Sequence, residues 1–340
     1  MYALLDSYIT PWFEQSFGLY LLSLFLSILA GFYLLIKGGD WLSDHSTNVA
    51  SKLGVPPVVV GLTIVSIATS TPELFTSLSA IRSDSPGLIH GNIIGSNIAN
   101  IALILGIALL VGNVPTKDAV SFTQRICLLV ITLGFCMFLF LSPMQEIGIS
   151  AGMLFLSFIA LYLIIIPLHA IRKKKSSSDQ AICEVPGSLS ANIYFSAFML
   201  VVSTVALWIG ADTLVYGSKN LAQLAGVPEE LIGFTLLAIG TSLPELAASI
   251  SLVRKKQTSM LLGNIVGSNL FNIALIGGLA GILGPVRSGS PYPWIDYLFL
   301  LLTTLMLFNW LKGKTLTKIE GLILLLIYLT ASVCTWVLNS

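Results

Sequence analysis

Charged residues are scarce in this sequence. Asp, Glu, Lys and Arg together make up 10% of its 340 residues, whereas hydrophobic residues make up 55%. Soluble globular domains contain about 25% charged residues, so this composition excludes an ordinary soluble protein. Apolar runs of about 20 residues, the length that crosses a bilayer as a helix, recur along the chain. The sequence therefore predicts an all-α polytopic membrane protein.

Cysteine and histidine are also rare, and neither is spaced like a set of metal ligands. The cysteines are Cys127, Cys136, Cys183 and Cys334. They include no CxxC pair, and three lie in apolar runs, which is typical of reduced packing residues. The histidines, His45, His90 and His169, lie at predicted span ends or in loops and are expected to be interfacial. No cofactor is predicted.

Ten apolar stretches are long enough to cross a membrane as helices. They cover residues 18–37, 56–81, 88–111, 123–141, 147–168, 191–211, 228–253, 258–284, 293–311 and 319–338. If the N-terminus is extracytoplasmic, fourteen of the 17 Lys and Arg residues lie on the cytoplasmic side, and only Arg82, Lys219 and Arg287 lie outside. This distribution follows the positive-inside rule. We expect a multi-pass protein of the plasma (inner) membrane with both termini extracytoplasmic.

Internal repetition is the strongest pattern in the sequence. Residues 38–114 align without a gap with residues 210–286 when 172 is added to each number, and 35 of the 77 positions are identical. Each half contains five predicted spans, so equivalent segments enter the membrane from opposite sides. The prediction is an inverted-topology repeat, in which binding sites lie near the membrane midplane between the halves.

The repeat also suggests how the chain is divided. Residues 1–17 are predicted to be an extracytoplasmic leader, and residues 18–168 form the first five-helix repeat. Residues 169–190, which begin with a basic run, are predicted to be a flexible cytoplasmic linker. The second five-helix repeat then covers residues 191–340.

A TSxPE motif occurs once in each half, at Thr69-Ser-Thr-Pro-Glu73 and Thr241-Ser-Leu-Pro-Glu245. Proline inside a helix removes a backbone hydrogen bond and clashes with the preceding turn, so helices 2 and 7 are predicted to be broken at Pro72 and Pro244. Each break is expected to free carbonyl groups around residues 66–69 and 238–241. The hydroxyls beside the breaks add further oxygens; they belong to Thr69, Ser70, Thr241 and Ser242.

Glu73 and Glu245 lie well inside their predicted spans, where an ionised group costs at least about 2.5 kcal/mol. No Lys or Arg lies at the same depth in any span. A carboxylate without a basic partner in such a site is either protonated or holds a mobile cation. The alternative is that both are protonated and serve only as structural hydrogen-bond donors.

The following span of each half repeats a Ser and an Asn four residues apart, Ser96 with Asn100 and Ser268 with Asn272. That spacing puts both side chains on one helix face. Together with the glutamates they make an all-oxygen ligand set, which suits Na⁺ or Ca²⁺ and suits Mg²⁺ less well. Four further asparagines are assigned mainly to helix–helix hydrogen bonding: Asn92, Asn97, Asn264 and Asn269.

Asp40 and Asp212 also match across the repeat, near predicted span ends. We expect both to lie on a solvated face. The alternative is a helix-end or gating role.

At these residues the sequence resembles the Ca²⁺/cation antiporter superfamily, specifically its prokaryotic sodium/calcium exchanger branch. The doubled TSxPE and GNxxGSNxxN blocks fall in the family's two alpha-repeats, here alpha-1 at 56–114 and alpha-2 at 228–286. The resemblance implies ten helices in an inverted repeat that exchange several Na⁺ for one Ca²⁺ by alternating access. It also implies long, sliding first and sixth helices, here residues 18 to about 50 and 191 to about 222.

Carried over position by position, the resemblance implies four central ion sites. Their ligands would be Glu73, Glu245, Thr69, Ser70, Thr241, Ser242, Ser96, Ser268, Asn100 and Asn272, with the carbonyls of Ser66 and Ala238. Several family members have Asp at one of the positions of Asn100 and Asn272, whereas both are Asn here. The central charge is then −2 when both glutamates are ionised, which leaves the exchange ratio and any role of K⁺ open.

Other functions remain as alternatives. A H⁺-coupled or other-cation-coupled Ca²⁺ antiporter is the first, although the proton-coupled branch has GNxxE where this chain has TSxPE. A cation channel ranks lower, because an inverted repeat with a buried two-glutamate site favours alternating access. An intramembrane enzyme ranks lowest, since no nucleophile–base pair accompanies the carboxylates. Expected partners are the transported ions and the lipid bilayer, with no nucleic acid.

Overall fold

The computed structural model describes residues 16–82, 86–142, 146–176, 192–225, 240–284, 286–288 and 292–339. The first half contains α2 (Phe17–Leu53), α3 (Pro57–Val60), η1 (Gly61–Val65), α4 (Ser66–Thr69), α5 (Thr71–Arg82), α6 (Pro86–Ile98), η2 (Ala99–Ile104), α7 (Leu105–Val111), β1 (Val114–Pro115), α8 (Phe122–Leu141), β2 (Glu146–Ile147) and α9 (Ile149–Ser176). The second contains α10 (Ile193–Leu224), α13 (Leu243–Arg254), α14 (Thr258–Leu270), η4 (Phe271–Ile276), α15 (Gly277–Leu283), β3 (Val286–Arg287), α16 (Pro293–Trp310), β4 (Thr315–Leu316) and α17 (Lys318–Asn339). The η elements are π-helical turns within longer helices.

Eight helices among the described residues are long and apolar enough to cross a membrane, and the bent pair Pro57–Thr69 and Thr71–Arg82 makes a ninth if it is counted as one span. The predicted all-α membrane architecture is therefore confirmed, apart from four two-residue strands. The seventh predicted span, residues 228–253, is described only from residue 240, and α13 begins at Leu243. Its first part lies outside the described residues, so the count of ten stays a prediction.

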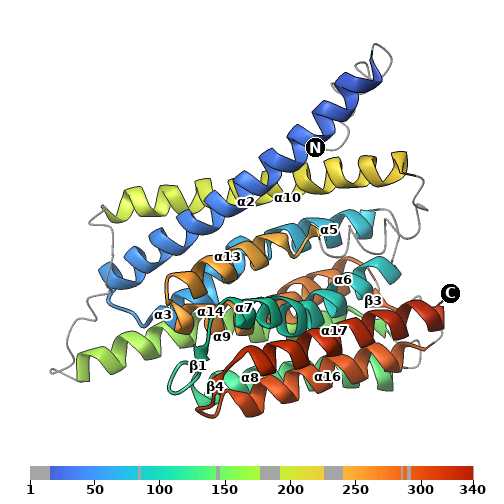
Figure 1. The fold of residues 1–340 in the computed structure, drawn as a ribbon. Coiled ribbons are helices and arrows are strands. Elements are labelled where there is room, and N and C mark those ends of the chain that lie inside the picture. The colour runs from blue at the N-terminus through green and yellow to red at the C-terminus, as the bar shows by residue number, and fades with distance from the viewer. Residues whose placement is uncertain are drawn as a thin grey trace.

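Two long helices, α2 and α10, cross one side of the bundle as an outer pair (Figure 1). Their lengths agree with those implied by the family resemblance. They approach each other at glycines: a Cβ at Gly31 would lie 2.8 Å from the Gly210 carbonyl oxygen, and one at Gly217 would lie 2.8 Å from that of Leu24. Small residues let helix backbones pack closely in lipid, so α2 and α10 form a tightly packed pair.

Element bounds in the two halves correspond under the same shift of 172 residues. α5, α6, η2, α7 and β1 become α13, α14, η4, α15 and β3. β1 pairs with β4 and β2 with β3, so each small sheet joins one half to the other. In Figure 1, β1 and β4 lie at one end of the bundle and β3 lies at the other.

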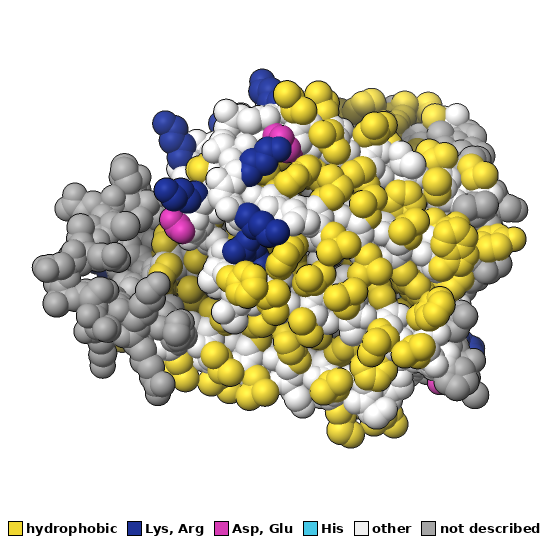
Figure 2. Space-filling view, turned by 90° about the horizontal axis from the view of Figure 1, so that it is seen from below, with side chains coloured by type: hydrophobic (Ala, Val, Ile, Leu, Met, Phe, Trp, Pro, Cys, Tyr) yellow, Lys and Arg dark blue, Asp and Glu magenta, His cyan; other side chains and the backbone are white. Residues whose placement is uncertain are grey.

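The surface is consistent with lipid contact. Figure 2 shows hydrophobic side chains over most of one face, with Lys and Arg gathered mainly toward one end. Large apolar side chains such as Phe140, Ile319 and Leu326 are mostly exposed. Exposure of this extent marks an interaction surface, and here it surrounds a bundle of membrane-length helices.

Some expectations about individual segments are wrong. Residues 169–176 extend α9 instead of starting a flexible linker, and residues 177–190 lie outside the described residues. Only residues 16 and 17 of the predicted leader are described. His45 and His90 are buried and contact Ser196 and Tyr297, because each lies on a helix face that packs inside the bundle.

Two glycines bring the halves together beside the broken helix. A Cβ at Gly61 of η1 would overlap the Met260 carbonyl oxygen, and a Cβ at Gly263 of α14 would overlap that of Val58. Backbone atoms cannot move aside as a flexible side chain can. Only glycine permits this crossing of the first half over α14.

We expect Gly263→Ala to destabilise the protein by roughly 1–3 kcal/mol, the usual cost of overpacking, because its methyl group meets the Val58 carbonyl. The measurement is the thermal unfolding midpoint of purified protein in detergent. Gly134→Ala in α8 is the control, since a Cβ at Gly134 would have no neighbour within 4 Å among the described residues. An unchanged midpoint for Gly263→Ala would contradict the close crossing.

Candidate functional site

The TSxPE motifs place a helix break at a serine. α4 ends at Thr69 and α5 begins at Thr71, with Ser70 at φ −83° and ψ 6° between them. Ser242 has φ −90° and ψ 2°, and α13 begins at the next residue. The breaks thus lie two residues before Pro72 and Pro244, because proline fits the first turn of a helix, where its missing N–H is not needed. At the first break the chain bends by 44°.

The carbonyl of Ser66 is not free, contrary to the expectation from the proline. It accepts the Ser70 amide at 2.9 Å, and the Ser66 hydroxyl donates to the Gly61 carbonyl at 2.7 Å. The Thr69 hydroxyl donates to the same carbonyl at 3.5 Å, so both of its lone pairs have a donor, and a cation there would displace the longer contact. Its predicted counterpart, Ala238, lies outside the described residues.

Glu73 and Glu245 are both buried, and each is contacted by a hydroxyl from the other half. The Ser70 hydroxyl donates to Glu245 Oε1 at 3.0 Å, and the Ser242 hydroxyl donates to Glu73 Oε1 at 3.5 Å. Each glutamate is only 1% exposed. The second oxygens, Glu73 Oε2 and Glu245 Oε2, have no hydrogen-bond partner among the described residues. The two motifs therefore meet in one buried site.

The serine–asparagine pairs supply further buried oxygens. The Asn272 amide nitrogen donates to the Ser96 hydroxyl at 2.8 Å, again across the halves. Partners are lacking, within the part of the chain that the structure describes, for Asn100 Oδ1, Asn272 Oδ1 and the Ser268 hydroxyl. Asn100 and Asn272 lie in the π-helical turns η2 and η4, and such turns occur frequently at functional sites.

This arrangement is suited to a cation. A buried polar group left without a partner costs about 1–3 kcal/mol, and several such oxygens occur beside two carboxylates here. The ion pairs given by the described residues join Lys255 to Asp40 and Asp44, and Lys314 to Glu320, so none neutralises Glu73 or Glu245. Carboxylate, amide and hydroxyl oxygens are ligands for hard cations such as Ca²⁺ and Na⁺.

The remaining predicted hydroxyls lie beside the glutamates. Thr69 is fully buried, and its hydroxyl lies 3.4 Å from Asn264 Oδ1. Thr241 is half-buried and lines a cavity of about 210 Å³ that extends to Asp212 on α10. Every predicted site residue within the described ranges thus lies in or next to the helix breaks and π-helical turns.

Helix–helix hydrogen bonding was expected for the other asparagines, and the structure shows it for some of them only. The Asn92 amide donates to the Glu73 carbonyl at 2.9 Å and to the Ser77 hydroxyl at 2.8 Å, which fixes α6 against α5. Asn97 and Asn269 instead donate to carbonyls of their own helices, so the helix–helix role is wrong for these amides. Sequence reasoning also missed Ser77, although its identity with Ser249 across the repeat was a signal.

Comparison with known proteins identifies a family and several relatives. The profile of the family described as "Sodium/calcium exchanger protein" matches residues 23–167 and 195–337. The chain is 32% identical over 337 residues to Sodium/calcium exchanger MaX1 of Methanosarcina acetivorans, covering 89% of this chain and 96% of the relative. It is 31% identical over 308 residues to Putative antiporter CaxA of Alkalimonas amylolytica, covering 89% and 95%.

Comparison with solved structures also finds a sodium-calcium exchanger. The fold is similar to that of the sodium-calcium exchanger NCX_Mj soaked with 10 mM Na⁺ and 10 mM Sr²⁺, with a TM-score of 0.75 and 27% identity. That match covers 92% of this chain and 98% of the other.

If the site holds Ca²⁺, the ion should stabilise the folded protein. At a Ca²⁺ concentration 100 times the dissociation constant, the gain is about 2.7 kcal/mol, read as a rise in the unfolding midpoint in detergent. Glu73→Gln and Glu245→Gln should each remove the rise. Glu320→Gln is the control because Glu320 pairs with Lys314 outside the site. A Ca²⁺-dependent rise that survives both site variants would place the ion elsewhere.

Proposed function

Because the chain belongs to the sodium/calcium exchanger protein family, we propose that it is a secondary active antiporter that exchanges Na⁺ for Ca²⁺ across the plasma (inner) membrane. The observation that carries this proposal is the pair of buried glutamates, Glu73 and Glu245, each with one carboxylate oxygen that has no hydrogen-bond partner among the described residues. A site of net charge −2 in a low-dielectric interior binds cations strongly.

The proposed architecture is two inverted repeats of five helices, residues 18–168 and 191–340, with both termini extracytoplasmic. The cytoplasmic connection at 169–190 begins with the last part of α9, which ends at Ser176. Its support comes from the matching element bounds and from the position of β1 and β3 at opposite ends of the bundle. The cytoplasmic excess of Lys and Arg supports the orientation.

We assign the ions to one central region that both halves build. Glu73 and Glu245 supply the charge. The neutral oxygens come from Thr69, Ser70, Thr241, Ser242, Ser96, Ser268, Asn100 and Asn272 and from the carbonyls of Ser66 and Ala238. Ca²⁺ and Na⁺ compete for the same carboxylates, so binding of one releases the other, which is the basis of exchange.

Occupancy also controls movement between the two access states. Two buried carboxylates without cations repel each other and are costly to seal from water. Binding of one Ca²⁺ balances the charge of both carboxylates, whereas the same balance by Na⁺ takes more than one ion. The occupied site can therefore close and open toward the other side, whereas the empty site stays hydrated.

The coupling ion is tested by swapping gradients. Proteoliposomes loaded with Na⁺ and diluted into Na⁺-free medium should accumulate ⁴⁵Ca²⁺, and collapse of the Na⁺ gradient with an ionophore should stop uptake. A H⁺ gradient alone should drive none. Uptake driven by H⁺ and not by Na⁺ would instead establish the H⁺-coupled alternative. Repetition with K⁺ and Li⁺ tests whether either ion takes part.

The same flux assay tests the site. Glu73→Gln and Glu245→Gln each remove one of the two charges, so Na⁺-driven Ca²⁺ uptake should fall to the level of protein-free liposomes. Glu320→Gln, the matched buried glutamate outside the site, should keep uptake within about two-fold of wild type, because its side-chain contacts are to Lys314 and Thr317 and not to the site. Wild-type uptake by either site variant would rule out this ligand assignment.

A further inference from the structure

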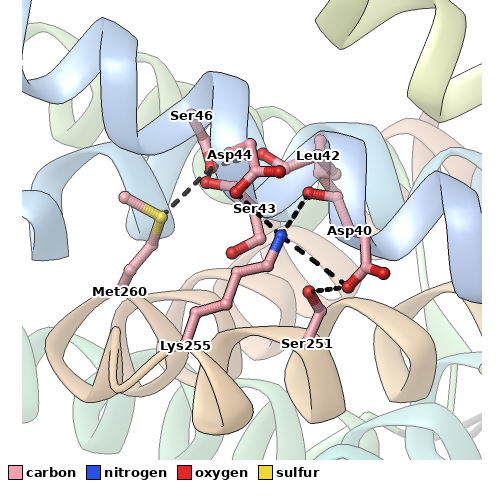
Figure 3. Close-up of polar contacts among 8 residues, drawn as sticks. All are labelled: Asp40, Leu42, Ser43, Asp44, Ser46, Ser251, Lys255 and Met260. Carbon is pink, nitrogen blue, oxygen red and sulfur yellow. Dashed lines mark hydrogen bonds and ion pairs between the residues drawn. The ribbon is translucent and has the colours of Figure 1, made fainter. Parts of the chain in front are cut away.

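A charged cluster joins the outer helix α2 to the end of α13 (Figure 3). Lys255 Nζ lies 2.7 Å from Asp44 Oδ1 and donates to the Asp40 carbonyl at 2.9 Å. The Ser251 hydroxyl donates to Asp40 Oδ1 at 2.7 Å. The solvated face expected for Asp40 is correct only in part, because the side chain is 35% exposed but its carboxylate faces α13.

This contact closes the space between the two helices, which we call the α2–α13 seam and define by Asp40, Asp44, Ser251 and Lys255. Ser251 is only 4% exposed. Next to it, a Cβ at Gly39 would lie 2.8 Å from the Ala247 carbonyl oxygen, so the backbones touch. Ala248 and Leu252 of α13 are each 1% exposed, so the helix is closely packed between the seam and Glu245, which lies six residues before Ser251.

The repeat places an Asp and a Ser at a second, equivalent seam, between α10 and α5. The counterparts of Asp40 and Ser251 are Asp212 on α10 and Ser79 on α5. These residues line the cavity of about 210 Å³ that also reaches Pro72 and Thr241 of the TSxPE motifs. Ser79 is exposed, in contrast to buried Ser251.

Equivalent seams are therefore in different states within one structure. One is closed by an Asp–Ser hydrogen bond, and the other holds a cavity that leads to the ion site. Since α2 and α10 are packed together through glycines, a shift of this pair against α5 and α13 moves both seams at once. Such a shift is the sliding that the family resemblance implies for these two helices, and it would close one seam while it opens the other.

We propose that the Asp40–Ser251 and Asp212–Ser79 pairs are the contacts that close the two seams as gates, and that the Lys255–Asp44 ion pair is a latch that holds the α2–α13 gate shut. This proposal rests on the proposed antiport function. With the proposed orientation, Lys255 lies in a cytoplasmic loop, so the closed gate is the cytoplasmic one.

The ion pair is the element that makes the two gates unequal. The repeat counterparts of Lys255 and Asp44 are Ser83 and Tyr216, which cannot form such a pair. Exposed ion pairs contribute modestly, and Lys255 is 31% exposed. Removal of the pair should therefore raise the population with an open cytoplasmic gate by roughly two- to five-fold.

Cysteine labelling measures that population without any transport. Ala248 of α13 is 1% exposed, and its repeat counterpart, Thr76, lines the open cavity. Ala248→Cys, in a protein whose four native cysteines are replaced, is exposed to a membrane-impermeant maleimide on inside-out vesicles free of Na⁺ and Ca²⁺. Lys255→Gln and Asp44→Asn should each raise the initial labelling rate two- to five-fold.

Three further variants make the result decisive. Lys314→Gln removes an ion pair of the same 2.7 Å length outside the gate and should leave the rate unchanged. The exchange Lys255→Asp with Asp44→Lys should restore the original rate. If Ala248→Cys does not fold, Leu252→Cys, equally buried on α13, takes its place as the reporter.

An unchanged labelling rate in Lys255→Gln, with or without a lower unfolding midpoint, would show that the pair is only structural and would overturn the proposal. The assay separates the two claims. Labelling that responds while Na⁺-driven ⁴⁵Ca²⁺ uptake is absent in wild type would sink the antiport function and keep the gate. Uptake in wild type, together with a labelling rate that is unchanged in Lys255→Gln, would keep the antiport function and overturn the gate.

Discussion

Two carboxylates buried in a membrane-spanning bundle without a basic partner are the constraint on which the other features of this protein depend. Ionised, they require cations and many neutral oxygens close by. The breaks at Ser70 and Ser242 turn hydroxyls toward the glutamates. The π-helical turns η2 and η4, which hold Asn100 and Asn272, pack against α13 and α5. Irregular backbone at such depth is tolerated only where it is enclosed by protein or lines a cavity.

Neither half of the chain contains a complete site. Ser70 contacts Glu245, Ser242 contacts Glu73 and Asn272 contacts Ser96, so each of these polar contacts runs from one repeat to the other. The glycine crossings at Gly61 and Gly263 bring the backbones close enough for these contacts. A change in how the halves pack must therefore change the ligand geometry, which couples ion binding to conformation.

The candidate site residues could be picked out of the sequence because repetition marked them. Glu73, Thr69 and Asn100 all recur at the same spacing in the second half, and hydropathy placed them inside spans. The exact break was not predictable from Pro72, because proline occupies a first turn as readily as it ends a helix. The contact of Asp40 with α13 joins residues remote in sequence, so span position alone did not predict it.

The Asp–Ser pair shows what a repeat adds to a single conformation. Asp40–Ser251 and Asp212–Ser79 have the same side chains, yet one pair closes its seam and the other borders a cavity. The Asp and Ser side chains are the same in both seams, so the difference comes from the residues around them and from the conformation. Lys255 and Asp44 lack basic and acidic counterparts in the other half. A symmetric fold with such unequal gates has two states of unequal energy, and the ion pair sets part of the gap.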